Sequence, residues 1–207
     1  MTRPLGVILA GGLSRRMGGG DKALSLLNGT SLMARVVARI GPQVGALAIN
    51  ANGDAARFSE FGLPVIADSV EGFAGPLAGV LAGLDWAASQ GAADIVTVAA
   101  DTPFFPSDLV MRLRADLGKD DTRISMAATP DAQRGLARQP TFALWPVALR
   151  EDLRAALSDG VRKVVVWADK HGCAVTEFEI GEIDPFFNVN TPEDMDKAAR
   201  FLSEGLV

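Results

Sequence analysis

The feature that most constrains the fold is an alternation between short apolar runs and longer helix-like stretches along the whole chain. The apolar runs, which have the length and composition of buried strands, span residues 5–9, 46–49, 64–67, 94–100, 124–128, 141–145 and about 174–179. Helices are expected near 31–40, 55–61, 77–89, 106–117, 147–157, 161–170 and 192–204. A turn is expected at Asn28-Gly29, and a polar loop over 129–140. This alternation predicts an α/β fold with a mostly parallel, doubly wound, Rossmann-like sheet covered by helices on both faces. No repeat or linker divides the 207 residues, so a single domain over residues 1–207 is expected.

Composition narrows the class of protein. With 20 basic and 25 acidic residues the formal charge is −5, which argues against a nucleic-acid partner. The only cysteine, Cys173, cannot form an intramolecular disulfide and suits a reducing compartment. The first apolar run is too short to span a bilayer and no signal peptide precedes it, so no membrane partner is expected. We therefore expect a cytoplasmic protein.

A glycine-rich loop follows the first expected strand. Residues 5–22 read LGVILAGGLSRRMGGGDK, in which two groups of glycines flank the Arg15-Arg16 pair and the loop ends on Asp21-Lys22. Glycines let backbone N–H groups approach phosphate oxygens, and the basic side chains neutralise their charge. A flexible surface loop is the alternative, but the strand before the loop favours a polyphosphate site. The spacing matches neither the Walker A loop nor the G-x-G-x-x-G dinucleotide fingerprint.

Polar residues stand directly after four expected strands: Gly11-Gly12, Asn50, Asp68 and Asp101. Because open α/β sheets bind ligands outside the carboxyl ends of their strands, these segments are expected to meet in one crevice. Asp101 is expected to hold a divalent cation, or alternatively to make a turn with the Thr102-Pro103 pair. Lys22 would contact phosphates, unless it is a solvated loop lysine. Asn50 and Asp68 suit the donors of a guanine base, although Asp68 could be an ordinary turn residue.

The motifs of this chain resemble those of the molybdenum cofactor guanylyltransferases, a family of nucleotidyltransferases. The resemblance rests on LAGG with the following MGG and DK, on NAN (50–52), DS (68–69), GPLAG (75–79), ADTP (100–103) and NVNTP (188–192). Ala100 departs from the family's cysteine, at a position expected to serve packing. The resemblance implies a nucleotidyltransferase fold and the transfer of GMP from GTP to the phosphate of molybdenum-bound molybdopterin, with release of pyrophosphate. It further implies a Mg²⁺ cofactor and transient contacts with proteins that deliver or accept the molybdenum cofactor.

The resemblance also implies roles for individual residues. The catalytic residues it implies are Lys22, Arg15, Arg16 and Asp101, with Asp101 as metal ligand; which arginine faces the reacting phosphates stays open. The nucleotide-binding residues it implies are Leu9, Ala10, Gly11, Gly12, Lys22, Asn50, Asp68 and Asp101. Further candidates are Gly75 and Leu77 in the GPLAG loop, which is expected to let backbone approach the base, Asn190 as a metal or phosphate contact, and Arg138 near the pterin phosphate. Asn190 could equally be a structural residue before the last helix.

Three other functions remain open at this point. A cytidylyltransferase acting on the same pterin and a sugar-phosphate nucleotidyltransferase would share the glycine-rich loop. The pair Gly11-Gly12 favours GTP, because those families more often carry alanine at one of the two positions. A non-catalytic nucleotide sensor is the alternative from another class, but it would have little need for Lys22 together with Asp101.

Overall fold

Seven strands form one sheet in the computed structural model, which describes residues 3–11, 21–70, 75–117 and 124–207. The strands are β1 (Leu5–Leu9), β4 (Leu47–Asn50), β5 (Val65–Ile66), β6 (Asp94–Ala99), β7 (Ser125–Asp131), β8 (Gly135–Pro146) and β9 (Ala174–Glu177). The helices are α1 (Leu32–Ile40), α2 (Pro76–Ser89), α3 (Leu109–Ala115), α4 (Arg150–Ser158), α5 (Val164–Lys170) and α6 (Pro192–Ser203). The 3₁₀ helices are η1 (Lys22–Leu24), η2 (Gly41–Gln43), η3 (Ala55–Phe61) and η4 (Val147–Leu149).

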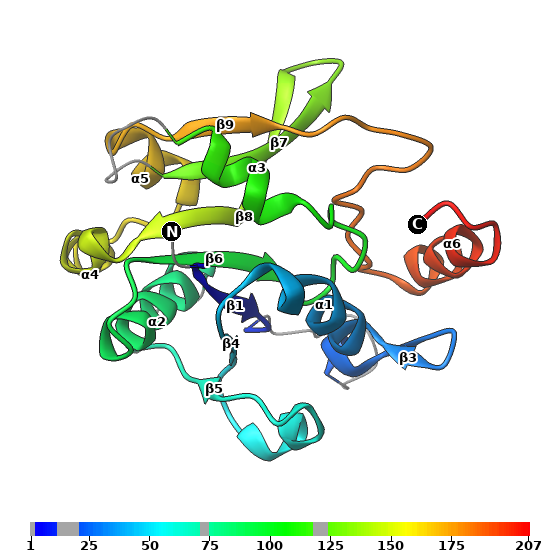
Figure 1. Cartoon of the computed structure of the whole chain (residues 1–207), viewed down its shortest axis with the longest axis horizontal. Helices are drawn as coiled ribbons and strands as arrows, with labels where there is room; N and C mark the ends of the chain where they lie inside the picture. The colour runs from blue at the N-terminus through cyan, green and yellow to red at the C-terminus, as the bar shows by residue number, and fades with distance from the viewer. Residues whose placement is uncertain (1–2, 12–20, 71–74, 118–123) are drawn as a thin grey trace.

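The sheet is mixed but mostly parallel, with the strand order β5-β4-β1-β6-β8-β7-β9 (Figure 1). Strand β8 runs antiparallel to both of its neighbours, whereas the remaining pairs are parallel. In Figure 1 the arrowheads of β1 and β6 point toward the side on which α6 and the C-terminus lie. The α/β class and the mostly parallel sheet expected from the sequence are confirmed.

Each face of the sheet carries its own hydrophobic core. Val7 and Ile8 are both fully buried, and because neighbouring strand residues point to opposite faces they belong to different cores. Ile8 belongs to the cluster that includes side chains of α1 and α3, while Val7 belongs to the cluster that includes side chains of α2, α4 and α5. Helices therefore cover both faces, as the alternating pattern predicted. A third cluster joins α6 to Leu27, Phe104 and Val189 at the end of the sheet.

One expectation about local structure is wrong. The segment 129–140, expected to be a polar loop, continues β7 and β8 as a hairpin in which Thr129 pairs with Ala137. Its tip is short because Asp131 accepts the backbone N–H groups of Gln133 and Arg134, and Gly135 adopts a φ of +74°. The residues at the end of this hairpin are polar because they are exposed to solvent, although they form strands. The short helix expected over 55–61 is confirmed, as the 3₁₀ helix η3.

A small hairpin lies directly before α1 in the chain. Strands β2 (Leu26–Leu27) and β3 (Thr30–Ser31) are joined by Asn28 and Gly29, whose φ values of 49° and 78° are typical of a type I′ turn. The turn expected at Asn28-Gly29 is confirmed. Ser31 then caps α1, because its hydroxyl accepts the backbone N–H of Ala34 at 3.1 Å. Within the described part of the chain, no helix combines the length and apolarity that crossing a membrane requires.

Candidate functional site

The carboxyl ends of three neighbouring parallel strands form the frame of the site. The backbone N–H of Ala10 after β1 donates to the Asn50 carbonyl at the end of β4, at 2.9 Å. On the other side of β1, the N–H of Ala100 donates to the Leu9 carbonyl at 3.1 Å. These bonds hold the ends of β4, β1 and β6 at one edge of the sheet. Leu9, Ala10, Asn50 and Asp101 therefore lie at the same edge, as the strand-end argument predicted.

Lys22 lies at the centre of a cluster of oxygen atoms at this edge. Its Nζ lies 2.6 Å from Asp101 Oδ2, 2.5 Å from Asn190 Oδ1 and 3.4 Å from Asn188 Oδ1. Only 13% of the Lys22 side chain and 25% of the Asp101 side chain are exposed. Segments that are far apart in the sequence thus place one carboxylate and two amide oxygens around a single positive charge. The structure brings Lys22, Asp101 and Asn190 together, three residues selected from the sequence.

The segment that carries both asparagines is fixed from two directions. The N–H of Val189 donates to the Asp101 carbonyl at 2.9 Å, and the Val189 side chain is fully buried. The Asp194 carboxylate accepts the backbone N–H groups of Asn190 and Thr191, each at 3.0 Å, as part of the capping box that starts α6. Partial burial raises the pKa of Asp194, but these hydrogen bonds to its charged form outweigh it and place the pKa below the ordinary value.

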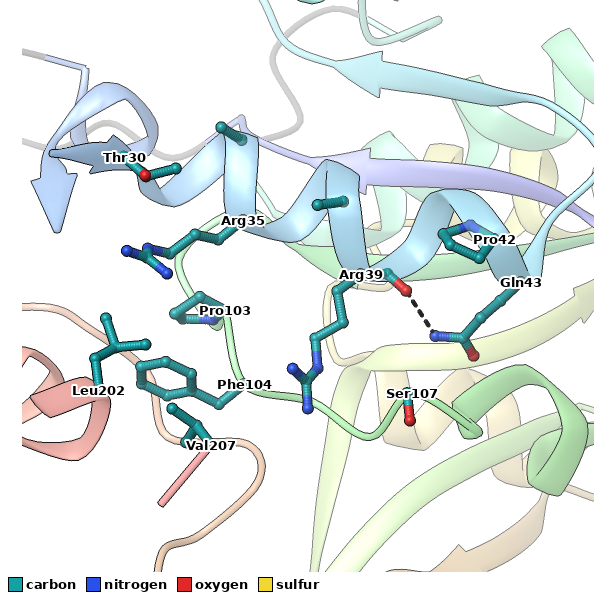
Figure 2. Close-up of a pocket in the computed structure, with 12 residues that line it drawn as sticks. Thr30, Arg35, Arg39, Pro42, Gln43, Pro103, Phe104, Ser107, Leu202 and Val207 are labelled. Atoms are coloured by element: carbon teal, nitrogen blue, oxygen red, sulfur yellow. Dashed lines mark hydrogen bonds between the residues drawn. The ribbon is translucent and has the colours of Figure 1, made fainter. Parts of the chain in front are cut away.

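Two arginines of α1 bind backbone carbonyls nearby, one of them in the segment that follows Asp101. Arg39 donates through its Nε to the Phe105 carbonyl, and Arg35 donates to the Leu27 carbonyl at 2.7 Å. Figure 2 shows both arginines at a cavity of about 530 Å³ between α1 and the segment carrying Pro103 and Phe104. Burial lowers the pKa of both guanidinium groups. None of the sequence-predicted site residues that the structure describes lines this cavity, and its arginines bind neighbouring backbone carbonyls.

Asp68 is held by a fork of two asparagines. Asn50, which is only 3% exposed, donates from Nδ2 to Asp68 Oδ1 at 3.0 Å and to the Ile66 carbonyl at 3.2 Å. Asn52 donates to Asp68 Oδ2 at 2.8 Å and accepts the Asp68 backbone N–H at 2.9 Å. Asp68 is therefore oriented as an acceptor and is not a freely rotating turn residue. Sequence reasoning paired Asn50 with Asp68 but missed Asn52, which it placed in the NAN motif without giving it a role.

The GPLAG segment behaves differently from the expectation. Gly75 precedes α2 with a φ of 154°, and Pro76 to Gly79 are already helical, so the predicted loop is the first turn of α2. The Leu77 side chain is 1% exposed and packs in the core, and the approach of this segment's backbone to the base stays a prediction. At Gly79, an added Cβ would lie 2.2 Å from Asn50 Oδ1. The glycine thus allows the helix to approach Asn50.

Some candidates lie away from this cluster or cannot be placed. Arg138 on β8 forms an ion pair with Asp169 on α5 at 2.5 Å, so the structure does not join it to the Lys22 cluster. Gly11 follows β1 and is exposed, and its added Cβ would lie 3.7 Å from Asn50 Oδ1. Gly12, Arg15 and Arg16 lie outside the described residues.

Two further residues at the site were not predicted from the sequence. Asn188 lies two positions before Asn190, and this spacing within NVN was the only signal that both amides face Lys22. Arg57, in the 3₁₀ segment η3, forms an ion pair with Asp21 at 2.7 Å, and it gave no signal because it belongs to none of the motifs and its partner is distant in the sequence.

Comparison with known proteins places the chain among nucleotidyltransferases. The family of the MobA-like NTP transferase domain matches residues 6–172. A molybdenum cofactor guanylyltransferase from Bradyrhizobium sp. ORS 278 is 50% identical over 198 residues, which cover 94% of this chain and 91% of the relative. Another from Mesorhizobium japonicum is 51% identical over 202 residues, covering 95% of each.

Solved structures support the same fold. The molybdopterin-guanine dinucleotide biosynthesis protein A from Archaeoglobus fulgidus is similar with a TM-score of 0.67 and 21% identity, over 97% of this chain and 99% of that one. The 4-diphosphocytidyl-2C-methyl-D-erythritol synthase from Anaerococcus prevotii is similar with a TM-score of 0.69 and 14% identity, over 98% and 96% of the two chains. At such identities the likeness describes the fold alone.

Proposed function

The chain belongs to the MobA-like NTP transferase family, among the molybdenum cofactor guanylyltransferases, and from this premise we propose that it transfers GMP from GTP to molybdopterin. The reaction joins an oxygen of the pterin phosphate to the α-phosphorus of GTP and breaks the bond to the bridging oxygen of the β-phosphate. Its products are molybdopterin guanine dinucleotide and pyrophosphate. The observation that carries the assignment of the reacting centre is the convergence of Asp101, Asn188 and Asn190 on the Lys22 ammonium.

We assign the base of GTP to a site at the carboxyl ends of β4 and β5. Guanine offers N1–H and N2–H₂ donors, which an oriented carboxylate can accept. Asp68 is the carboxylate at this place. The side chains of Asn52 and of buried Asn50 each donate a hydrogen bond to it and thereby fix its orientation. The backbone of Leu9 to Gly11 lies beside Asn50 and would complete the nucleotide pocket.

The oxygen cluster around Lys22 fits a Mg²⁺ ion that is shared with the substrate. Mg²⁺ is usually bound through one or two carboxylates and substrate phosphates, with water at the remaining positions. No group of three His, Cys, Asp or Glu side chains that could hold a metal lies among the described residues, so a metal cage made of protein alone is not supported there. Asp101 and Asn190 would hold the ion, which would neutralise charge on the phosphates as the pyrophosphate leaves.

Catalysis is assigned to positioning and charge stabilisation, without a protein nucleophile. Lys22 is mostly buried at the strand ends, so its ammonium would interact with the phosphates in a region of low solvent exposure. Arg15 and Arg16 are proposed to bind phosphate oxygens from the glycine-rich loop. The pterin phosphate would supply the attacking oxygen.

The remaining assignments concern the second substrate and the surroundings of the enzyme. Arg138 is kept as a candidate for the pterin side, although its ion pair with Asp169 would have to open. We propose transient contacts with proteins that supply or accept the cofactor. A cytoplasmic site of action agrees with the single cysteine, which suits a reducing compartment.

The proposal is tested by pyrophosphate release from purified protein supplied with Mg²⁺, molybdenum-loaded molybdopterin, and either GTP or CTP. We expect release with GTP that depends on the pterin, and much slower release with CTP. Lys22→Met should abolish most of it, whereas Lys170→Met, an exposed lysine at the end of α5, should not. A preference for CTP would contradict the guanine assignment. No release with either nucleotide would favour a nucleotide sensor.

A further inference from the structure

Arg57 connects the two parts of the proposed nucleotide site. Its Nε lies 2.7 Å from Asp21 Oδ2, its Nη2 donates to the Asn52 carbonyl at 2.9 Å, and its Nη1 donates to the Asp54 carbonyl at 2.6 Å. We propose that Arg57 is a positioning residue, which sets Lys22 and Asp68 in the register that one GTP molecule requires. This inference rests on the proposed function, and it assigns no contact between Arg57 and the substrate.

On the phosphate side, Arg57 acts through Asp21. The Asp21 carboxylate accepts the Ala23 N–H at 3.1 Å, and the Asp21 carbonyl accepts the Leu24 N–H at 2.9 Å. Asp21 thereby caps the turn η1, which begins with Lys22. The ion pair to Arg57 fixes the carboxylate that fixes this turn. About a quarter of each side chain is exposed, so the pair is partly shielded from water.

On the base side, Arg57 acts through Asn52. The Asn52 carbonyl is bound by the guanidinium, and the Asn52 side chain makes two hydrogen bonds to Asp68. The intervening Gly53 has a φ of +83°, which gives this loop a sharp turn that few other residues would adopt. A loop with so little regular structure needs an external support, and the guanidinium supplies it by binding two of its carbonyls.

The geometry of the guanidinium suits this role better than an ammonium would. All three of its nitrogens are used, in three directions, and its Cζ lies 4.6 Å from the centre of the Phe58 ring, which is fully buried. A planar group with several fixed donors can hold a carboxylate and two carbonyls at once, whereas lysine offers a single point of charge. Arg57→Lys is therefore expected to behave like Arg57→Gln and not like the wild type.

The first test measures amide hydrogen exchange by mass spectrometry in the protein without nucleotide. Arg57→Gln should increase exchange in both segments that Arg57 holds, residues 21–24 and 52–54, and in the segment around Asp68. Arg112→Gln is the matched control, because Arg112 also lies over a phenylalanine ring, at 4.1 Å from Phe178, and donates to a backbone carbonyl. It should leave these segments unchanged. Unchanged exchange in Arg57→Gln would overturn the inference, whatever the enzyme's activity.

The second test measures kcat and KM for GTP and for inosine triphosphate, which lacks the 2-amino group. A misplacement of about 1 Å in a reacting geometry can cost roughly 100-fold in rate, so a partial shift in Arg57→Gln should lower kcat/KM for GTP by about tenfold. The preference for GTP over inosine triphosphate should fall as well, because Asp68 is no longer held. A merely structural role would lower stability and leave this preference at the wild-type value, which would overturn the inference. Wild-type protein without GTP turnover would instead contradict the proposed function and leave the exchange test decisive for Arg57.

Discussion

Substitution of Gly79 by alanine tests how closely α2 must approach Asn50. The new Cβ would lie 2.2 Å from Asn50 Oδ1 and 2.8 Å from Leu9 Cδ2. Since carbon–oxygen contacts begin near about 3.3 Å, the amide must retreat by roughly 1 Å. Asn50 would then lose its hydrogen bond to Asp68, now 3.0 Å long. We expect overpacking to cost about 1–3 kcal/mol of stability, and GTP affinity to fall by about tenfold or more.

Gly83→Ala provides the matched control on the same helix. Its Cβ would lie 2.8 Å from Val7 Cγ2 and 2.9 Å from Ile95 Cδ1, so the strain is of the same kind but involves only core side chains. Urea unfolding should therefore show similar losses for both variants. Calorimetric titration with GTP and Mg²⁺ should show weaker binding for Gly79→Ala only. Wild-type GTP affinity in Gly79→Ala, or an equal loss of GTP affinity in the two variants, would refute the argument that Asn50 positions the nucleotide site.

Three further predictions concern single side chains. Asp101→Asn should lower kcat by roughly 100- to 1,000-fold across a Mg²⁺ titration, and unchanged turnover would exclude it as the metal ligand. Thr97→Val leaves the buried Trp145 Nε1–H without its 2.9 Å acceptor, which should cost about 1–3 kcal/mol in urea unfolding; unchanged stability would refute this. The pKa of Asp194 is lowered on folding, so its stabilisation is present above the unfolded pKa and disappears as pH falls through the folded value. Asp194→Asn should therefore be less stable than the wild type near neutral pH and converge with it in acid, and a constant difference would contradict that.

The sheet edge was predictable from sequence because strand ends obey a topological rule. Once 5–9, 46–49 and 94–100 were assigned as parallel strands, the residues after them had to meet at one edge. Family motifs added Asn190, which the structure places against Lys22. Both inferences depend on local patterns, which a single chain displays directly.

The rest depends on contacts that local patterns do not encode. Leu77 belongs to a recognisable motif, but the motif does not reveal that its side chain faces the core. Arg57 binds Asp21, which lies 36 positions earlier in the sequence, and no local pattern reveals a contact over that separation. The extension of β7 and β8 through residues 129–140 was missed because its exposed residues are polar, which in a sequence resembles a loop. Tertiary packing decides each of these cases.

The most direct test of the central claim is a crystal structure of the protein with Mg²⁺ and a GTP analogue that cannot be cleaved. The account predicts a metal ion within coordination distance of the Asp101 carboxylate. Lys22 should have moved from that carboxylate onto the triphosphate, and the guanine should lie against Asp68. A triphosphate bound in the cavity beside Arg35 and Arg39, or a nucleotide that touches neither Lys22 nor Asp101, would contradict it.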